Sequence, residues 1–482
     1  MSTSRLDLRE WIRKVESLDE LKKVEGADWN LEIGAIGALN IKRKDPSALL
    51  FDRVKGYPAG YRLLTSSVCT ANRVAVTMGL PTGRTDLELL SIMREKLFEW
   101  KGNAGKYPPE WVKSGPVLEN INSGRDINMW KFPTPKWHEL DGGRYIGTAH
   151  SVITRDPDTG EINLGTYRVM VHDEKTTALH ISPGKHGRLA YEKYHARGQA
   201  CPVAVSVGHH PLFYCASCVE LPVGTEYGFM GAVTGERVKV IEEEVTGLPI
   251  PADSEVVFAG WVPPGKRMPE GPFGEWTGYY GAEGKRPETP IIEVERVYHR
   301  NDPILIGTME DRPPSDATYY RVLMTSAILY NELVASNVPD VKGVWISQEA
   351  GGQTLIVVSI KQRYAGHAKQ AALLTSQLRI GAYMGKYVVV VDEDIDPTDT
   401  AQVIWAICTR SEPAEDIDIL RKCWSGPLDP RIRKPTNAFF NSRAIIDATK
   451  PFDWKDEFPT DIRLSPELAK NTKEKWGWLW KG

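Results

Sequence analysis

The sequence predicts a multidomain protein of the α+β and α/β classes, in which a barrel-like sheet precedes a separate α/β domain. Three observations support this prediction. The chain has 482 residues, enough for two to four structural units. Short β-forming runs dominate from about residue 117, as is typical of a barrel-like sheet. Strand-like and helix-like runs alternate after residue 339, which favours an α/β domain.

The first 116 residues are expected to form a mixed α/β unit. Ser4 is a candidate N-cap for a first helix, in which apolar residues recur at helical spacing from Leu8 to Val15. A polar, proline-bearing stretch from residue 102 to 117 separates this unit from the next. The other elements expected in the unit are helices over 29–43 and 86–100 and strands over 48–54 and 61–67.

Residues 117–312 are expected to form the barrel-like sheet. A β-hairpin is expected from strands over 145–155 and 161–173, because Asp156–Gly160 places proline and glycine where a tight turn needs them. The remaining elements expected here are strands over 178–182, 203–207, 255–262 and 291–298 and helices over 187–197 and 225–234.

The segment 313–338 is expected to be a connecting helix between two bodies. Asp316–Asn337 follows the rigid run Arg312–Ser315, which contains two prolines, and ends near Pro339. Residues 339–482 then form the third unit. The elements expected in that unit are strands over 341–347, 354–361 and 387–391 and helices over 365–380 and 400–409.

Composition excludes several classes of function. The formal net charge is −3 and the basic residues are scattered, so the chain has no electrostatic footprint for nucleic acid or an anionic membrane. No apolar signal core or membrane-length run is present, which predicts a cytoplasmic protein. The six cysteines fit reduced, buried thiols. Cys215 and Cys218 have the spacing of a zinc or redox pair but lack a second pair.

The stretch Met268–Gly281 holds two acids, Glu270 and Glu275, among four glycines, two prolines and four aromatic rings. Such a density of glycine and proline excludes a regular helix and predicts a specified loop. The many rings favour a partly dry pocket, where two carboxyls can take different protonation states. The alternative is a surface loop with two solvated glutamates.

Several polar residues are candidates for binding an anion or a metal ion. Arg168, on the second hairpin strand, can grip a carboxylate with two parallel hydrogen bonds, or it is a surface arginine. Gly184–His186 opens a helix, where free amides favour an anion. Asn163, His186 and Glu226 offer the ligand types that suit Mn²⁺ or Mg²⁺ bridging to phosphate. The pair His209–His210 lacks a third ligand at metal spacing and receives no role.

Together these motifs resemble the UbiD family of decarboxylases, which use prenylated flavin mononucleotide (prFMN). The similarity runs from about residue 45 to 450. The motifs that carry it are Asn163 with Arg168, His186, Glu226, the run Glu-Gly-Pro-Phe-Gly-Glu at 270–275, and Gly-His-Ala-Lys-Gln at 366–370.

The resemblance implies a fold and a set of roles. The fold is an N-terminal α/β portion with a flavin-binding split β-barrel, joined by a helix to a C-terminal α/β oligomerisation domain. Arg168, Glu270 and Glu275 correspond to a catalytic Glu-Arg-Glu trio, with Glu275 as the proton donor. Asn163, His186 and Glu226 would hold the divalent ion, Mn²⁺ or Mg²⁺, and a K⁺ site is implied near residues 215–218. The residues implied to contact the cofactor are Asn163, Thr166, Tyr167, Arg168, Lys185, His186, Ser217, Cys218, Glu226 and Lys369.

The resemblance further implies non-oxidative, reversible decarboxylation of an aromatic or heteroaromatic acid, with CO₂ as a product. Trp276, Tyr279 and Tyr280 favour a flat indole-, pyrrole- or phenol-type ring. Arg312 either meets a second polar group of the substrate or braces the proline turn. Implied partners are a flavin prenyltransferase that supplies the cofactor and further copies of the chain, as a homodimer or homohexamer. The alternatives are a flavin oxidoreductase on the same barrel and a non-catalytic subunit of a carboxylase complex.

Overall fold

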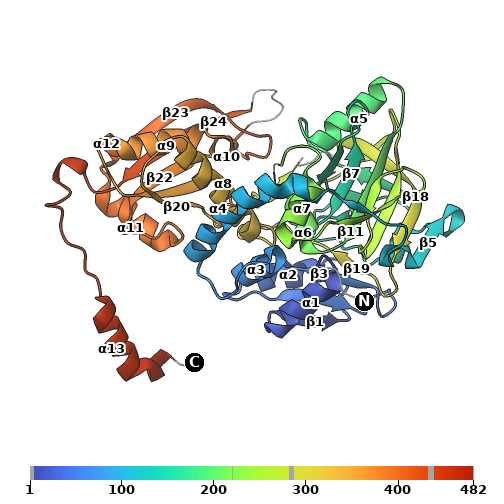
Figure 1. Ribbon diagram of the computed structural model, residues 1–482, viewed down its shortest axis with the longest axis horizontal. Coiled ribbons are helices and arrows are strands. Elements are labelled where there is room, and N and C mark those ends of the chain that lie inside the picture. Colours follow the sequence, from blue (N-terminus) through green and yellow to red (C-terminus); the bar gives the residue numbers. More distant parts are fainter. Residues whose placement is uncertain (1–4, 220, 282–286, 433–438, 481–482) are drawn as a thin grey trace.

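The computed structural model describes residues 5–219, 221–281, 287–432 and 439–480 (Figure 1). A mixed N-terminal unit, drawn in blue, lies beside a large sheet drawn in green and yellow. A long helix leads from there to the C-terminal body, drawn in orange. Within the described part of the chain, no helix is both long and apolar enough to cross a membrane.

The N-terminal unit is built on a four-stranded sheet of order β1-β2-β3-β19. The N-cap of its first helix is Asp7, whose side chain accepts a hydrogen bond from Arg9 N at 2.7 Å. The expected cap, Ser4, is therefore wrong, and it lies outside the described residues. The expected helices and strands of this unit are confirmed. The elements are α1 (Leu8–Ser17), β1 (Leu21–Glu25), α2 (Glu32–Ile41), β2 (Ala48–Asp52), β3 (Arg62–Thr65), α3 (Ala71–Met78), α4 (Asp86–Asn103) and β19 (Ile304–Ile306).

The central sheet has ten antiparallel strands and curls into a half-barrel. Its main path is β6-β9-β10-β18-β14-β11-β7-β8, and β5 and β15 pair with the long strand β18. The strands are β5 (Asn120–Ser123), β6 (Arg144–Gly147), β7 (Ser151–Arg155), β8 (Ile162–Gly165), β9 (Val169–Val171), β10 (Thr176–Leu179), β11 (Cys201–Gly208), β14 (Val256–Val262), β15 (Arg267–Pro269) and β18 (Glu288–His299).

The expected hairpin forms between β7 and β8, but both of its strands are shorter than expected. The chain leaves the ladder at residues 148–150 and again at 166–168. Side chains in these breaks bond to each other's backbone: Thr166 Oγ1 donates to His150 O at 2.8 Å, and His150 Nε2 lies 2.7 Å from Tyr167 O. Arg168 therefore sits in a gap between strands.

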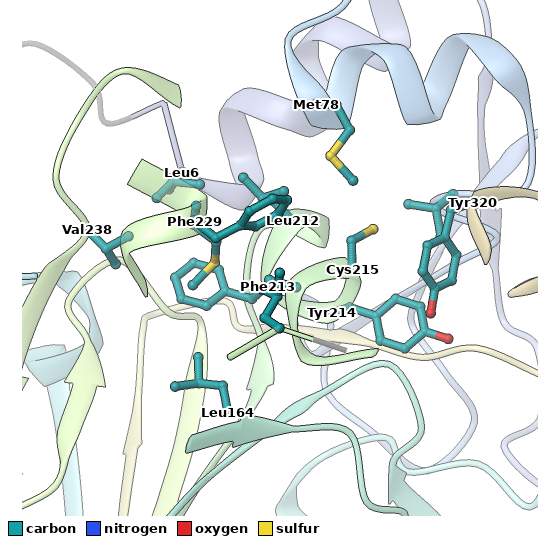
Figure 2. Packing of buried hydrophobic residues seen from close by; sticks show 14 of the residues in the cluster. Leu6, Met78, Leu164, Leu212, Phe213, Tyr214, Cys215, Phe229, Val238 and Tyr320 are labelled. Carbon is teal, nitrogen blue, oxygen red and sulfur yellow. The ribbon is translucent and has the colours of Figure 1, made fainter. Parts of the chain in front are cut away.

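A buried core packs against the sheet and holds the end of β8, just before residues 166–168 (Figure 2). It joins Leu164 of β8 with helices α6 (Pro211–Cys218), α7 (Glu226–Thr234) and α8 (Thr318–Ala335). The rings of Tyr214 and Tyr320 lie 5.2 Å apart between centroids, with their hydroxyls turned toward each other. Helix α5 (His186–Ala196) packs against β7 and β8.

The pair His209–His210 has a structural explanation. His210 Nδ1 accepts a hydrogen bond from Leu212 N at 3.1 Å and so caps α6. Burial lowers the pKa of His210 to about 3 and that of His209 to about 4, so both rings are neutral. A neutral ring can accept the capping bond, which a charged one cannot.

Helix α8 belongs to two cores. Tyr320 and Leu323 in its first half pack in the core shown in Figure 2. Leu329 and Leu333 in its second half pack against the C-terminal sheet, whose strand order is β20-β21-β22-β24-β23. The C-terminal elements are β20 (Val341–Ile346), β21 (Leu355–Ile360), α9 (His367–Gln377), α10 (Arg379–Ala382), β22 (Tyr387–Asp392), α11 (Thr400–Arg410), α12 (Pro413–Asp416), β23 (Ile417–Trp424), β24 (Phe440–Ala448) and α13 (Pro466–Trp476).

Smaller elements complete the fold. Helix α13 stands apart from the rest of the molecule at the end of an extended segment (Figure 1). The remaining strands are β4 (Glu110–Trp111), β12 (Lys239–Glu242), β13 (Pro249–Pro251), β16 (Phe273–Gly274) and β17 (Tyr280–Gly281), and the short 3₁₀ helices are η1 (Ala104–Lys106), η2 (Pro116–Glu119), η3 (Gly124–Asp126), η4 (Met129–Lys131), η5 (Phe452–Trp454) and η6 (Gly477–Trp480).

Candidate active site

The acidic loop at residues 268–281 has no helix, as expected, and its two acids are shielded from water. Its strands β16 and β17 form a small hairpin, closed by Glu275 N donating to Tyr279 O at 3.0 Å. The Glu270 side chain is fully buried, and the Glu275 side chain is 13% exposed. The alternative of two solvated glutamates is therefore wrong.

Arg168 joins the two acids. Its Nε and Nη2 donate to Oε1 and Oε2 of Glu270 at 2.8 and 3.0 Å, which is a two-pronged ion pair. Its Nη1 donates to Glu275 Oε1 at 2.5 Å. The Arg168 side chain is 13% exposed, so the interpretation as a surface arginine is also wrong. The structure thus brings the predicted trio into one cluster.

The trio is strongly coupled electrostatically. Burial raises the pKa of Glu270, but contacts with His180 and Arg168 outweigh it and hold this pKa at about 2. Burial lowers the pKa of Arg168, whereas the negative charges of Glu275 and Glu270 raise it above its ordinary value. Glu270 is therefore a carboxylate and Arg168 a guanidinium at neutral pH.

Three aromatic groups surround the trio, and two of them, Tyr145 and His180, were not singled out from the sequence. Tyr145 OH donates to Glu270 Oε1 at 2.9 Å, and His180 Nδ1 lies 3.3 Å from Glu270 Oε2. The Arg168 guanidinium carbon lies 4.9 Å from the centre of the Phe273 ring. Tyr145 and His180 lie far from the acidic loop in sequence, so no local pattern connects them to it.

The expected aromatic wall is formed differently from the prediction. Phe273 is the ring of the loop that faces Arg168, and it packs on Tyr145 at 4.5 Å between centroids. Tyr279 is 61% exposed, so it does not line a closed pocket. Trp276 lies near Arg321 of α8, whose guanidinium carbon is 5.9 Å from the Trp276 ring centre. Tyr280 OH accepts a bond from Leu140 N at 3.4 Å.

Two of the three predicted metal ligands line one cavity. Asn163 and His186 contribute to its wall, together with Glu161 and Lys193, and its volume is about 430 Å³. Glu226 lies next to this segment, because the backbone of Leu164 hydrogen-bonds to its carboxyl. In the described residues, no cluster of three or more His, Cys, Asp or Glu side chains is placed to hold a metal ion, and the predicted set relies on Asn163.

Within the described residues, no basic side chain lowers the pKa of the Glu226 carboxyl. Burial raises its pKa to about 7, and its Oε2 is a buried oxygen without a hydrogen-bond partner in the described chain. An unsatisfied buried acceptor is costly unless something pairs with it. A divalent cation beside Oε2 would satisfy this oxygen, so the residues present fit a bound metal ion.

Tyr167 links this region to helix α5. Its hydroxyl accepts a bond from Gly187 N at 3.1 Å and one from Asn163 Nδ2 at 3.4 Å. The first turn of α5 is thereby held beside β8, and its free amides can face an anion. The exposed Lys185 is the N-cap of α5, so it stands at the same end of the helix as His186.

Thr166, Ser217 and Cys218 also come together. Thr166 N donates to Ser217 O at 3.2 Å, and the Cys218 thiol interacts with the side chains of Thr166 and Tyr320. Ser217 Oγ lies 2.7 Å from Ser151 Oγ. All six cysteines are free, so Cys215 and Cys218 do not form a disulfide.

Lys369 and Arg312 lie apart from these clusters. Lys369 is on α9 and its ammonium pairs with Asp418 of β23, so a phosphate contact would require it to leave that partner. Its predicted role stays a prediction. The side chain of Arg312 is exposed, while its carbonyl and that of Pro314 accept bonds from Lys42 Nζ.

Family models match most of the chain. They are the N-terminal domain, the Rift-related domain and the C-terminal domain of 3-octaprenyl-4-hydroxybenzoate carboxy-lyase, which match residues 12–93, 110–313 and 319–448. Arg168, Glu270 and Glu275 all lie in the Rift-related domain.

Relatives and solved structures agree with this match. The chain is 32% identical over 462 residues to a phenolic acid decarboxylase of Sedimentibacter hydroxybenzoicus, covering 92% of both chains. It is 31% identical over 502 residues to a pyrrole-2-carboxylic acid decarboxylase of Pseudomonas aeruginosa, covering 99% of this chain and 98% of that one.

The fold is similar to that of the UbiD-class enzyme HmfF from Pelotomaculum thermopropionicum in complex with FMN. The TM-score is 0.86 at 28% identity, covering 98% of this chain and all of the other. An evolved dimeric form of HmfF in complex with prFMN gives a TM-score of 0.80 at 28% identity, with coverages of 98% and 99%. The matches over all three domains and the decarboxylase relatives show that the chain is a carboxy-lyase and belongs to the UbiD family.

Proposed function

We propose that the protein catalyses the reversible, non-oxidative decarboxylation of an aromatic or heteroaromatic carboxylic acid with prFMN. The observation that carries this proposal is the buried contact of Arg168 with both Glu270 and Glu275. The relatives act on phenolic and pyrrole acids by name, which supports a phenol-, pyrrole- or indole-type substrate. The prFMN complex of HmfF supports the cofactor.

Loss of CO₂ from an sp² carbon leaves an unstable carbanion, and prFMN supplies the electron sink for it. The chain's own residues position the substrate and move the proton. Arg168 keeps N–H groups beyond those given to the two acids, and these orient the substrate carboxylate. Glu270 holds Arg168 in place. Glu275 delivers a proton to the carbon that CO₂ leaves. In the carboxylation direction the same group accepts that proton.

The cavity beside Asn163 and His186 is the proposed site of the cofactor phosphate and a Mn²⁺ or Mg²⁺ ion. The unsatisfied Glu226 Oε2 supports this assignment, since a cation would complete its partners. A K⁺ ion would bind near residues 215–218, with backbone carbonyl oxygens as its ligands. The other proposed contacts of the cofactor are Thr166, Tyr167, Lys185, Ser217, Cys218 and Lys369.

The protein would be cytoplasmic, and a flavin prenyltransferase would supply its cofactor. It would assemble as a homodimer or homohexamer through its C-terminal domain. Exposed apolar side chains on that domain support assembly: Ile419 and Trp424 of β23 are 51% and 46% exposed, and Phe440 of β24 is 50% exposed.

The proposal is tested by co-expressing the protein with a flavin prenyltransferase. The purified protein should show the absorbance spectrum of bound prFMN and release CO₂ from at least one acid in a panel of phenol-, pyrrole- and indole-carboxylic acids. A spectrum of plain flavin with hydride transfer would favour an oxidoreductase, and a colourless, inert protein would favour a non-catalytic subunit. Either result contradicts the proposal.

The Glu275→Gln variant tests the proton donor. Because general acid–base catalysis contributes about 10²–10⁴-fold, turnover should fall by at least that order while the variant still binds prFMN. The measurement is CO₂ release at saturating substrate, with absorbance used to normalise for cofactor content. Near-wild-type turnover would remove Glu275 from the mechanism.

A further inference from the structure

The carboxylate of Glu270 has more partners than the catalytic trio requires. Besides the two bonds from Arg168, Oε1 accepts a bond from Tyr145 OH at 2.9 Å and Oε2 faces His180 Nδ1 at 3.3 Å. Each oxygen thus faces one nitrogen of the guanidinium and one group from elsewhere in the chain. Tyr145 and Glu270 are almost completely buried, so solvent does not compete for the bond between them.

Neighbouring strands of the central sheet place these groups. Tyr145 lies on β6, Arg168 immediately precedes β9, and His180 immediately follows β10, and these three strands are adjacent. Tyr145 pairs with Met170 in the ladder, and His180 N donates to Arg168 O at 3.0 Å. The backbone therefore aligns three side chains toward one carboxylate, which is an arrangement built by the sheet itself.

His180 is poised rather than fully bonded. Its Nδ1 is a buried nitrogen without a well-aligned hydrogen bond in the described residues, and Glu270 Oε2 is the acid beside it. The side chain as a whole is 32% exposed. A small rotation of the ring would align Nδ1 with Oε2. The contact can therefore strengthen when Arg168 shifts.

Such a shift is expected when substrate binds. The guanidinium gives three of its five N–H groups to Glu270 and Glu275. A substrate carboxylate on the two remaining N–H groups competes with Glu270 and Glu275 for the same positive charge, which weakens the hold of Arg168 on Glu270. Without other donors, Glu270 would then be a buried carboxylate with unsatisfied oxygens, which is costly. Tyr145 and His180 supply those donors.

We propose that Tyr145 and His180 are positioning residues of the reaction: they hold Glu270 in place while Arg168 turns part of its fork to the substrate carboxylate. This inference rests on the proposed function, because it concerns the substrate that Arg168 binds. Neither residue touches the reacting carbon. Their effect reaches it through Glu270 and Arg168.

Four variants test the inference in the prFMN-loaded enzyme. Tyr145→Phe removes the hydroxyl and keeps the ring that packs on Phe273. His180→Leu removes the donor, whereas His180→Asn keeps an amide N–H near the place of Nδ1. Tyr298→Phe is the matched control, since Tyr298 OH donates to the buried Glu243 Oε1 at 2.7 Å in the same sheet.

We expect Tyr145→Phe and His180→Leu each to lower kcat/KM by about 10- to 100-fold, the range typical when a group that orients a site residue is lost. His180→Asn should restore most of the activity, and Tyr298→Phe should leave it within about twofold of wild type. Cofactor content should be unchanged in all four. Activity within twofold of wild type in both Tyr145→Phe and His180→Leu overturns the inference. So does an equal loss in Tyr298→Phe, which would make the effect a general one on folding.

A second measurement does not depend on turnover. Benzoate binding to the cofactor-free protein by calorimetry should weaken by about 5- to 10-fold in Tyr145→Phe and His180→Leu but not in Tyr298→Phe, because a misplaced Arg168 holds a carboxylate less well. Unchanged benzoate affinity in both variants contradicts the positioning role. A wild-type enzyme that binds benzoate through Arg168 yet decarboxylates no acid contradicts the proposed function alone.

Discussion

At the scale of single residues, the site depends on how charged side chains are stabilised when they are buried. Glu270 is fully buried, and its carboxylate is stable there because Arg168, Tyr145 and His180 surround it. Glu275 shares the same guanidinium but retains some exposure. One acid is therefore closed off from solvent, and the other keeps some contact with it.

This arrangement predicts a pH dependence of stability. The folded-state pKa of Glu270, about 2, lies below its ordinary value of about 4.5, so its contribution to stability is present above pH 4.5 and is lost as pH falls toward 2. The contribution is at most about 3 kcal/mol. Thermal midpoints measured from pH 7 to pH 3 should fall less steeply for Glu270→Gln than for wild type. Parallel curves would show that Glu270 is not held as a carboxylate.

At the scale of elements, the acidic loop depends on a close approach between two turns. Gly278 has φ +79°, and a Cβ at this position would lie 3.0 Å from Arg312 Cα. Lys42 braces the second turn by binding the carbonyls of Arg312 and Pro314. The position of Glu275 therefore depends on a contact with the segment that leads into α8.

The Gly278→Ala variant should displace the loop and lower kcat by about tenfold or more, because a small misplacement of a catalytic group is costly. The thermal midpoint should change little, since the residues next to Gly278 are partly exposed and Phe273, which belongs to a main core, lies on the other strand of the hairpin. Gly265→Ala is the matched control: it carries similar backbone strain at φ +74°, but its Cβ would meet nothing within 4 Å. Equal kcat values for the two variants would contradict this account.

Local patterns predicted many elements, while tertiary contacts decided the rest. The hairpin at Asp156–Gly160 follows from its turn residues, and helix α4 follows from apolar residues at helical spacing, which the structure buries. Helix α6 was missed because it is almost wholly buried and has no polar face to reveal its period. The breaks at residues 148–150 and 166–168 depend on the cross-bond between His150 and Thr166, which no local pattern contains.

The same distinction applies to the site. Resemblance to a family predicted that Arg168 would meet Glu270 and Glu275, and the structure brings them together. Tyr145 lies 125 residues before Glu270, and the sequence of its strand gives no sign that its hydroxyl binds a buried carboxylate. Lys369 was predicted from a motif that opens a helix, but its surroundings in α9 could not be inferred from that motif.

At the scale of the whole molecule, the C-terminal arm, residues 465–480, packs little against the rest of the described chain. Helix α13 has no buried residue, and Leu468, Trp476 and Trp478 are 54%, 43% and 63% exposed. Among the described residues, Arg463 ties the preceding segment to Asp394 at 2.9 Å. Apolar side chains in this number are normally covered, which fits the proposed assembly into a homo-oligomer.

Deleting residues 465–482 should therefore shift the protein from its oligomer toward smaller species, measured by light scattering. The control replaces Lys470 and Glu474 by alanine, which keeps the arm and its apolar side chains. An unchanged number of chains per oligomer after the deletion would show that the arm takes no part in assembly.

The double membership of helix α8 limits how this protein can be recombined. Tyr320 and Leu323 are packed in the core shown in Figure 2, and Leu329 and Leu333 against the C-terminal sheet. A chimera joined after residue 338 would therefore present a foreign sheet with the wrong half-helix. The junction of a working chimera has to lie inside α8, or the chimera has to carry matching substitutions along that helix. The two bodies can therefore be exchanged only together with the half of α8 that packs on each.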